Sequence, residues 1–235
     1  MFSIDNLGHM NYNQIFHVYN HAIAFEDLFK DEFCYSIFLN RLTKHISPFA
    51  DILAFCLMPN HFHLVVRIRS EDDVKAAAEF LYNPVKRSDR LKYVKLKMKQ
   101  LDNNPSLFIS RRFADCFNSY SKTINLIYKR KGSLFIKNFK RKIVDSDSYL
   151  THLIYYVHVN PVRHELRKNV NQWQWCSYKS YFKEDFNFVE TSYIINHFGG
   201  LDAFLEHHNK PYRRPSADDD DHDTEVGFLS HFKYF

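Results

Sequence analysis

Several features that would define a class of protein are scarce or missing from this chain. It has only 5 glycines among 235 residues, while fibrous chains are rich in glycine. No apolar run reaches the roughly 18 residues that a membrane-spanning helix needs. The first residues lack the basic region and apolar core of a signal peptide. We therefore expect a globular, cytoplasmic protein that is neither secreted nor inserted in a membrane.

Cysteine is also scarce, and its spacing excludes two common kinds of site. The 4 cysteines are scattered along the chain, and no two of them form a C-x-x-C pair. This distribution argues against a zinc knuckle and against a disulfide framework. A reducing compartment fits such a chain best.

Hydrophobic and aromatic residues are abundant. Hydrophobic residues make up 45% of the chain and aromatic residues 17%, which is enough to bury a substantial core. We expect one domain over residues 1–210, with a basic insertion at about 83–112. The remaining residues, 211–235, contain a run of four aspartates at 218–221 and are expected to form a flexible acidic tail.

The net charge of +5 conceals a strongly basic middle of the chain. Residues 86–142 hold 17 Lys and Arg against 3 Asp and Glu, with tyrosines and phenylalanines between them. Basic side chains neutralise phosphates and aromatic rings stack on unpaired bases, so this mixture favours single-stranded or hairpin nucleic acid. A solvated helix face that only aids solubility remains the alternative.

The pattern of apolar residues predicts a mixed α/β order. We expect strands over 14–24, 52–58 and 61–68, helices over 29–45, 71–82 and 109–131, an exposed extended insertion after Pro84, an extended or strand segment over 133–144, and a helix that is capped at 145–148 and ends at Pro161.

Two histidines stand at the start of an apolar stretch, as His61-Phe62-His63. In a strand alternate side chains share a face, so this pair points one way and can bind one divalent cation. A histidine on a strand is more often a hydrogen-bonded polar group, and a metal site needs a third ligand. The opposite face is apolar and is expected to be the buried one; it contains Phe62, Leu64, Val66 and Ile68.

The last predicted helix carries a second polar row. His152, Tyr156 and Asn160 are spaced four apart and share one helix face, whereas Tyr155 is rotated by about 100°. Tyr156 is therefore the better placed of the two tyrosines for chemistry, although a tyrosine within a helix usually serves packing. Tyr120 and Tyr128, on the basic helix, compete for the same role.

Three motifs in order resemble one protein family. They are Met58-Pro59-Asn60-His61-Phe62-His63-Leu64-Val65-Val66, then Tyr156-Val157-His158-Val159-Asn160-Pro161-Val162-Arg163, then the segment from Trp173 to Tyr181. Together with the first predicted strand, Phe16-His17-Val18-Tyr19-Asn20, they are similar to the single-tyrosine HUH transposases, most closely the REP-associated tyrosine transposases. The resemblance spans roughly residues 12–182.

This resemblance implies an α/β (α+β) ferredoxin-like domain, the HUH endonuclease architecture, with a mostly antiparallel sheet flanked by helices. It implies that His61, His63 and Asn160 bind Mg²⁺ or Mn²⁺. It also implies that Tyr156 attacks a DNA phosphate to give a 5′-phosphotyrosine and a free 3′-OH, which can later be rejoined.

The implied partner is single-stranded or hairpin DNA, bound by a monomer or a homodimer. The basic residues expected to contact it are Arg111, Arg112, Lys129, Arg130, Lys131, Lys140, Arg141, Lys142 and Arg163.

Two other functions remain open at this stage. One is a domesticated hairpin-binding protein that keeps the DNA-binding surface but has no catalytic turnover. The presence of His61, His63, Tyr156 and Asn160 argues against it. The other is a metal-dependent phosphoesterase in which water attacks. The shortage of carboxylates near the histidines argues against that second alternative, because two-metal hydrolases need several.

Overall fold

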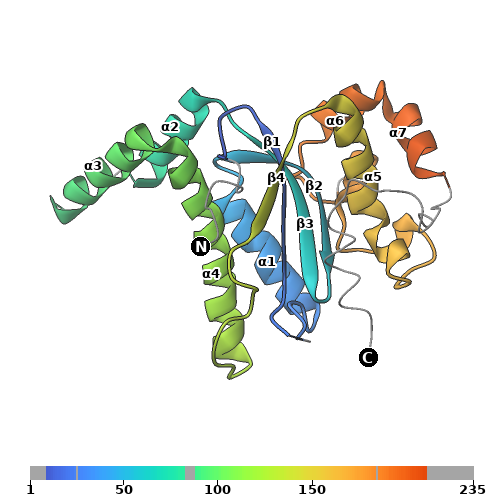
Figure 1. Cartoon of the computed structure of the whole chain (residues 1–235), viewed down its shortest axis with the longest axis horizontal. Coiled ribbons are helices and arrows are strands. Elements are labelled where there is room, and N and C mark those ends of the chain that lie inside the picture. Colours follow the sequence, from blue (N-terminus) through green and yellow to red (C-terminus); the bar gives the residue numbers. More distant parts are fainter. Residues whose placement is uncertain (1–8, 25, 83–87, 184, 211–235) are drawn as a thin grey trace, which may run out of the picture.

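The computed structural model describes residues 9–24, 26–82, 88–183 and 185–210, without the side chains of 88–94. The predicted acidic tail, 211–235, lies outside this description. Figure 1 shows the elements in order: β1 (Ile15–His21), α1 (Glu32–His45), β2 (Ala50–Met58), β3 (His61–Ile68), α2 (Glu71–Tyr82), α3 (Ser88–Asn103), α4 (Pro105–Ile127), β4 (Lys140–Val144), α5 (Asp147–Arg163), η2 (Val170–Gln172), η3 (Ser177–Tyr181), α6 (Thr191–Phe198) and α7 (Leu201–His208).

The four strands form one antiparallel sheet in the order β2-β3-β1-β4. Strands β2 and β3, which were predicted over 52–58 and 61–68, form a hairpin closed at Pro59 and Asn60. The crossover through α1 leaves room for β3 to insert beside β1, and β4 then pairs with the other side of β1. The predicted ferredoxin-like arrangement of an antiparallel sheet flanked by helices is therefore confirmed.

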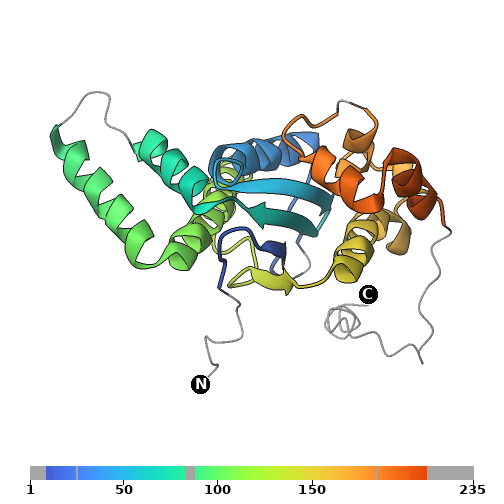
Figure 2. The same cartoon turned by 90° about the horizontal axis from the view of Figure 1, so that it is seen from above.

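Helices cover both faces of the sheet (Figures 1 and 2). Helices α1 and α4 pack together on one face, where the ring of Phe62 lies 5.0 Å from both Phe38 of α1 and Phe117 of α4. Helix α5 packs on the opposite face, against β2 and β3. Both faces of β3 are thus buried, and the expectation that only its apolar face would be buried is wrong.

The segment after Pro84 also differs from its prediction. It is not extended from residue 88 onward but forms helix α3, which pairs with α2 as a helical arm projecting from the domain (Figure 2). Lysines at 95, 97 and 99 alternate with apolar residues and so imitate the period of a strand. Lys, Leu, Met and Gln are good helix formers, however, and Leu101 is fully buried.

Two helix boundaries differ for local reasons. Helix α4 begins at Pro105, earlier than predicted, because the Asn104 side chain accepts a hydrogen bond from the Leu107 amide at 2.9 Å. It ends before Tyr128, which is followed by Lys129 in the left-handed region at φ 50°. Helix α5 continues through Pro161 to Arg163, so proline sits inside the last turn instead of ending the helix.

The chain after α5 covers the open edge of β2. The Leu57 amide donates to the Trp175 carbonyl at 2.9 Å, and the Glu190 amide donates to the Ile52 carbonyl at 2.8 Å. A covered edge strand cannot pair with another chain. None of the helices in the described part of the chain has the length and hydropathy to cross a membrane.

A buried network of hydrogen bonds connects this segment to α5 and α7. The Ser177 hydroxyl accepts from the Phe55 amide at 2.9 Å and lies 3.0 Å from His158 Nε2, and His158 Nδ1 lies 2.9 Å from His208 Nε2. His158 is therefore a structural residue of α5.

Replacing Ser177 by Ala should lower the free energy of unfolding by about 1–3 kcal/mol, because it leaves the buried Phe55 amide and His158 without their partner. Urea denaturation measures this. Ser180→Ala is the matched control, since the Ser180 hydroxyl has no hydrogen bond within the described residues, and it should change stability little. Equal effects of the two substitutions on the free energy of unfolding would contradict the stabilising role of this hydrogen-bond network.

Candidate active site

The two histidines of β3 lie beneath helix α5. His61 is 2% exposed and His63 is fully buried, and their ring centroids are 5.1 Å apart. Burial in an apolar layer disfavours the charged imidazolium and holds the pKa of both histidines well below the usual value. Both rings are therefore neutral at pH 7, the form in which histidine binds metals.

Helix α5 places its polar row against this pair. The helix starts where the Ser146 hydroxyl accepts from the Tyr149 amide at 3.2 Å, and its apolar stripe packs on the sheet. The Tyr156 ring then lies edge-on to His63 with centroids 5.3 Å apart. Asn160, one turn later, brings its Oδ1 to 3.3 Å from His61 Nε2. The third residue of the predicted row, His152, is exposed and is not part of the cluster.

Both ring nitrogens of His61 lie near an amide oxygen, and a neutral ring can donate to only one of them. The shorter contact, 2.7 Å from His61 Nδ1 to Asn60 Oδ1, favours the tautomer that donates from Nδ1 and leaves a lone pair on Nε2. That lone pair faces Asn160 Oδ1, which is also an acceptor. A cation between these two acceptors would satisfy both.

His63 presents a similar nitrogen. Its Nδ1 lies 3.0 Å from His17 Nε2, while its Nε2 is buried and has no hydrogen-bond partner among the described residues. The amide nitrogen of Asn160 is equally buried and unpartnered in that part of the chain. Of these two atoms, the imidazole nitrogen can present a lone pair to a cation, whereas the amide nitrogen is a donor.

Sequence reasoning did not give His17 a role. It faces the site from β1, and burial, together with Lys142 directly opposite on β4, lowers its pKa to about 3. The polar residues His17, Tyr19 and His21 alternate on β1, and this period of two was the signal that could have placed them on one sheet face. His21 stacks on His61 with centroids 4.7 Å apart, and burial lowers its pKa to about 4.

The predicted DNA contacts fall into three groups. Three lie on the sheet face or helix that forms the site: Lys140 and Lys142 flank Tyr19 and His17 in the register of β4 with β1, and the Arg163 guanidinium carbon is 4.5 Å from the Tyr156 ring centroid. Three others, Arg111, Lys129 and Lys131, are exposed on or just after α4.

The remaining three are engaged within the protein. Arg112 pairs with Asp115 and packs over the ring of Phe108. Arg130 pairs with Glu26, and Arg141 donates to the Ser110 hydroxyl at 2.9 Å. Arg112 also donates to the Tyr82 hydroxyl of α2, so each of the three side chains joins two segments of the chain, and their contact with DNA stays a prediction.

The other tyrosines are placed differently. Tyr120 is buried against α1 and donates to the Leu28 carbonyl at 2.6 Å, and burial raises its pKa. Tyr128 donates to Asp31, which also raises its pKa. The Tyr155 hydroxyl donates to the Lys210 carbonyl at 3.2 Å. None of the three has a ring contact with His61 or His63 in the described part of the chain.

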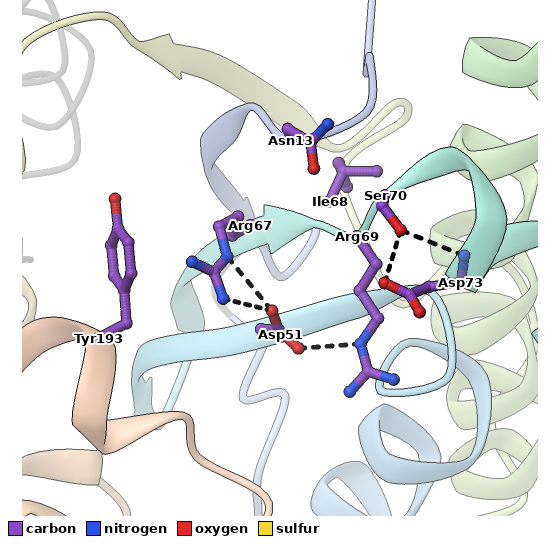
Figure 3. A pocket seen from close by; sticks show the side chains of 8 residues that line it. All are labelled: Asn13, Asp51, Arg67, Ile68, Arg69, Ser70, Asp73 and Tyr193. Carbon is purple, nitrogen blue, oxygen red and sulfur yellow. Dashed lines mark hydrogen bonds and ion pairs between the residues drawn. The ribbon is translucent and has the colours of Figure 1, made fainter.

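A separate cavity lies at the far end of β3 and is shown in Figure 3. Its two arginines, Arg67 and Arg69, both donate to the carboxylate of Asp51 at 2.8 Å. Its second carboxylate, Asp73, accepts from the Ser70 hydroxyl at 2.6 Å. The charges therefore compensate within the wall, which is the arrangement of a structural network.

The donor set at the histidines fits a divalent cation. In the residues described, no three His, Cys, Asp or Glu side chains are arranged as a metal cluster; the set consists of two neutral imidazoles and one amide oxygen. Such a set adds no negative charge and leaves coordination positions for phosphate oxygens. His17 and Asn60, bonded to the other ring nitrogens, are the outer partners that metal-binding histidines usually have.

Comparisons with known proteins give a limited result. No protein-family model and no curated protein matches this chain. One solved structure, described as "Structure of the REP associates tyrosine transposase bound to a REP hairpin", is similar with a TM-score of 0.49 and 12% identity, over 77% of this chain and 87% of that chain. The similarity concerns the course of the backbone, and the assignment of the site rests on the side chains of this chain.

We predict that the protein binds one Mn²⁺ and that His63→Ala abolishes this binding, because it removes the buried unpartnered nitrogen. Titration of free Mn²⁺ by electron paramagnetic resonance measures the affinity. His152→Ala, a change at an exposed histidine of α5, is the control and should bind as the unchanged protein does. Equal affinity of His63→Ala and His152→Ala would exclude the site.

Proposed function

We propose that this protein is a metal-dependent enzyme that nicks and rejoins single-stranded DNA near hairpins, with Tyr156 as the nucleophile. The observation that carries the proposal is the contact between the Tyr156 ring and His63, whose buried Nε2 lacks a partner in the described residues. The ring of the proposed nucleophile therefore adjoins the ring of a proposed metal ligand. The order of motifs predicted this pairing, and the folded side chains support it.

The chain supplies the groups that a phosphoryl transfer to tyrosine requires. The Tyr156 oxygen would attack phosphorus and form a phosphodiester, while the bond from phosphorus to the 3′ oxygen breaks. The phenol loses its proton and the departing 3′ oxygen gains one. Because the new ester conserves the energy of the old one, a 3′-OH can reverse the reaction without ATP.

Charge at the site supports this reaction. Arg163 lies over the Tyr156 ring at 4.5 Å, so its positive charge favours the negative charge that develops on the phenolic oxygen and the phosphate. His61, His63 and Asn160 would hold the divalent cation, which when bound polarises the phosphate. Two neutral histidines add no negative charge that would repel DNA.

DNA would approach the site from the side of β4, because α5 covers β2 and β3. Helix α5 packs on β2 and β3, whereas Lys140 and Lys142 of β4 are exposed beside the cluster. Tyr19, between them and His63, is half-buried. A strand that crosses β4 would place its phosphates on the lysines, and its bases could stack on aromatic rings.

The test is incubation of the protein with labelled hairpin DNA that carries single-stranded flanks, with Mg²⁺ or with EDTA, followed by denaturing electrophoresis. We expect a Mg²⁺-dependent covalent protein–DNA band that Tyr156→Phe abolishes. Tyr155→Phe is the matched control, because the neighbouring ring points toward α7, and it should retain the band.

The other outcomes discriminate the alternatives. Binding without a covalent band, over hairpins of many sequences, would overturn the enzymatic proposal in favour of a DNA-binding protein without turnover. Cleavage that survives Tyr156→Phe would assign the attack to water and make the protein a phosphoesterase.

A further inference from the structure

His17 is a buried residue of β1 to which the motifs assign no role. It is 2% exposed and lies directly opposite Val65 of β3, so that His63 is its diagonal neighbour on the same sheet face. Diagonal pairs in an antiparallel sheet are within reach of long side chains. The two rings lie stacked with centroids 5.2 Å apart and an angle of 26° between them.

The contact between the two rings is a directed hydrogen bond. His17 Nε2 and His63 Nδ1 are 3.0 Å apart, so one of them donates and the other accepts. If His17 donated, His63 would carry its own proton on Nε2, and this buried donor would have no acceptor in the described part of the chain. If His63 donates, Nε2 carries a lone pair instead, which is the form that binds a cation.

The His17 ring also contacts the nucleophile. Its centroid lies 6.3 Å from that of Tyr156, edge to face. The Tyr19 ring, two residues along β1, stacks on it with centroids 4.8 Å apart. One buried ring therefore touches both the predicted ligand and the predicted nucleophile. A residue in this place can set their relative orientation without contacting DNA itself.

We infer that His17 is a positioning residue that holds His63 in the tautomer with its proton on Nδ1 and its Nε2 aimed beneath Tyr156. The inference rests on the proposed function for its purpose, but the tautomer is a property of the protein without metal or DNA. Outer partners of this kind typically change metal affinity by about 10–100-fold when they are removed.

The first measurement is the ¹⁵N spectrum of the histidine rings in the metal-free protein, which distinguishes protonated from unprotonated nitrogens. We expect His63 with an unprotonated Nε2. In His17→Phe, which keeps an aromatic ring but has no acceptor, a larger share of His63 should carry the proton on Nε2. His17→Gln, whose amide oxygen can accept the same hydrogen bond, should restore the original tautomer.

The second measurement is Mn²⁺ affinity of the same variants. We expect His17→Phe to bind roughly 10–100-fold more weakly and His17→Gln to recover most of the loss, while His152→Phe, on the exposed side of α5, binds normally. A merely structural role would not be rescued by the change to glutamine, which alters the ring packing further than phenylalanine does.

The outcomes separate this inference from the proposed function. The inference is overturned if His63 carries its proton on Nε2 in the unchanged protein. It is also overturned if His17→Phe changes neither the tautomer of His63 nor the Mn²⁺ affinity. A protein that shows the expected tautomer and affinities but forms no covalent DNA complex would retain the inference and lose the proposed enzyme.

Discussion

The burial of a histidine pair between a sheet and a helix is the constraint on which the rest of this structure depends. Two imidazoles under α5 are stable there when they are neutral, and each buried nitrogen without a partner costs free energy. Asn60 and His17 satisfy one nitrogen of each ring. The remaining nitrogens face Asn160 and an orphaned position beneath Tyr156. Two of the buried polar atoms that lack a partner within the described residues, on His63 and Asn160, belong to this cluster.

The secondary elements serve this placement. The hairpin of β2 and β3 sets the two histidines at the beginning of β3, and the insertion of β3 beside β1 brings His17 to their level. The segment that covers the edge of β2 contacts α5 through the hydrogen bond between Ser177 and His158. Because these contacts are buried, the orientation of Tyr156 relative to His63 depends on the whole domain and not on one loop.

Much of the sheet could be predicted from the sequence. The alternation of β1, the turn at Pro59 and the apolar stripe of α5 are local signals, and each gave the correct element. The lysines at 95, 97 and 99 misled because alternating charge has the period of a strand, while helix propensity and the burial of Leu101 decided the outcome. Pro161 misled in the opposite way, since a proline near a helix end is tolerated when the turn around it is packed.

The site was predictable only in part. The pairing of His61 with His63 and of Tyr156 with Asn160 follows from strand and helix periods, and the structure brings these four together. His17 could not be placed beside them because its contact depends on the register between β1 and β3, which no local pattern gives. The pairing of Arg130 with Glu26 was equally hidden, whereas Arg112 and Asp115 are three apart on one helix, a spacing that the sequence does show.

We propose that His61, His63 and Asn160 hold one divalent cation next to residue 156, where a DNA phosphate would bind. The most direct measurement is a crystal structure of Tyr156→Phe with Mn²⁺ and a hairpin that carries single-stranded flanks, with the metal located by anomalous scattering. We expect an Mn²⁺ peak next to His61, His63 and Asn160, with a DNA phosphate beside it. An Mn²⁺ bound elsewhere, or DNA whose phosphates do not approach this helix, would contradict it.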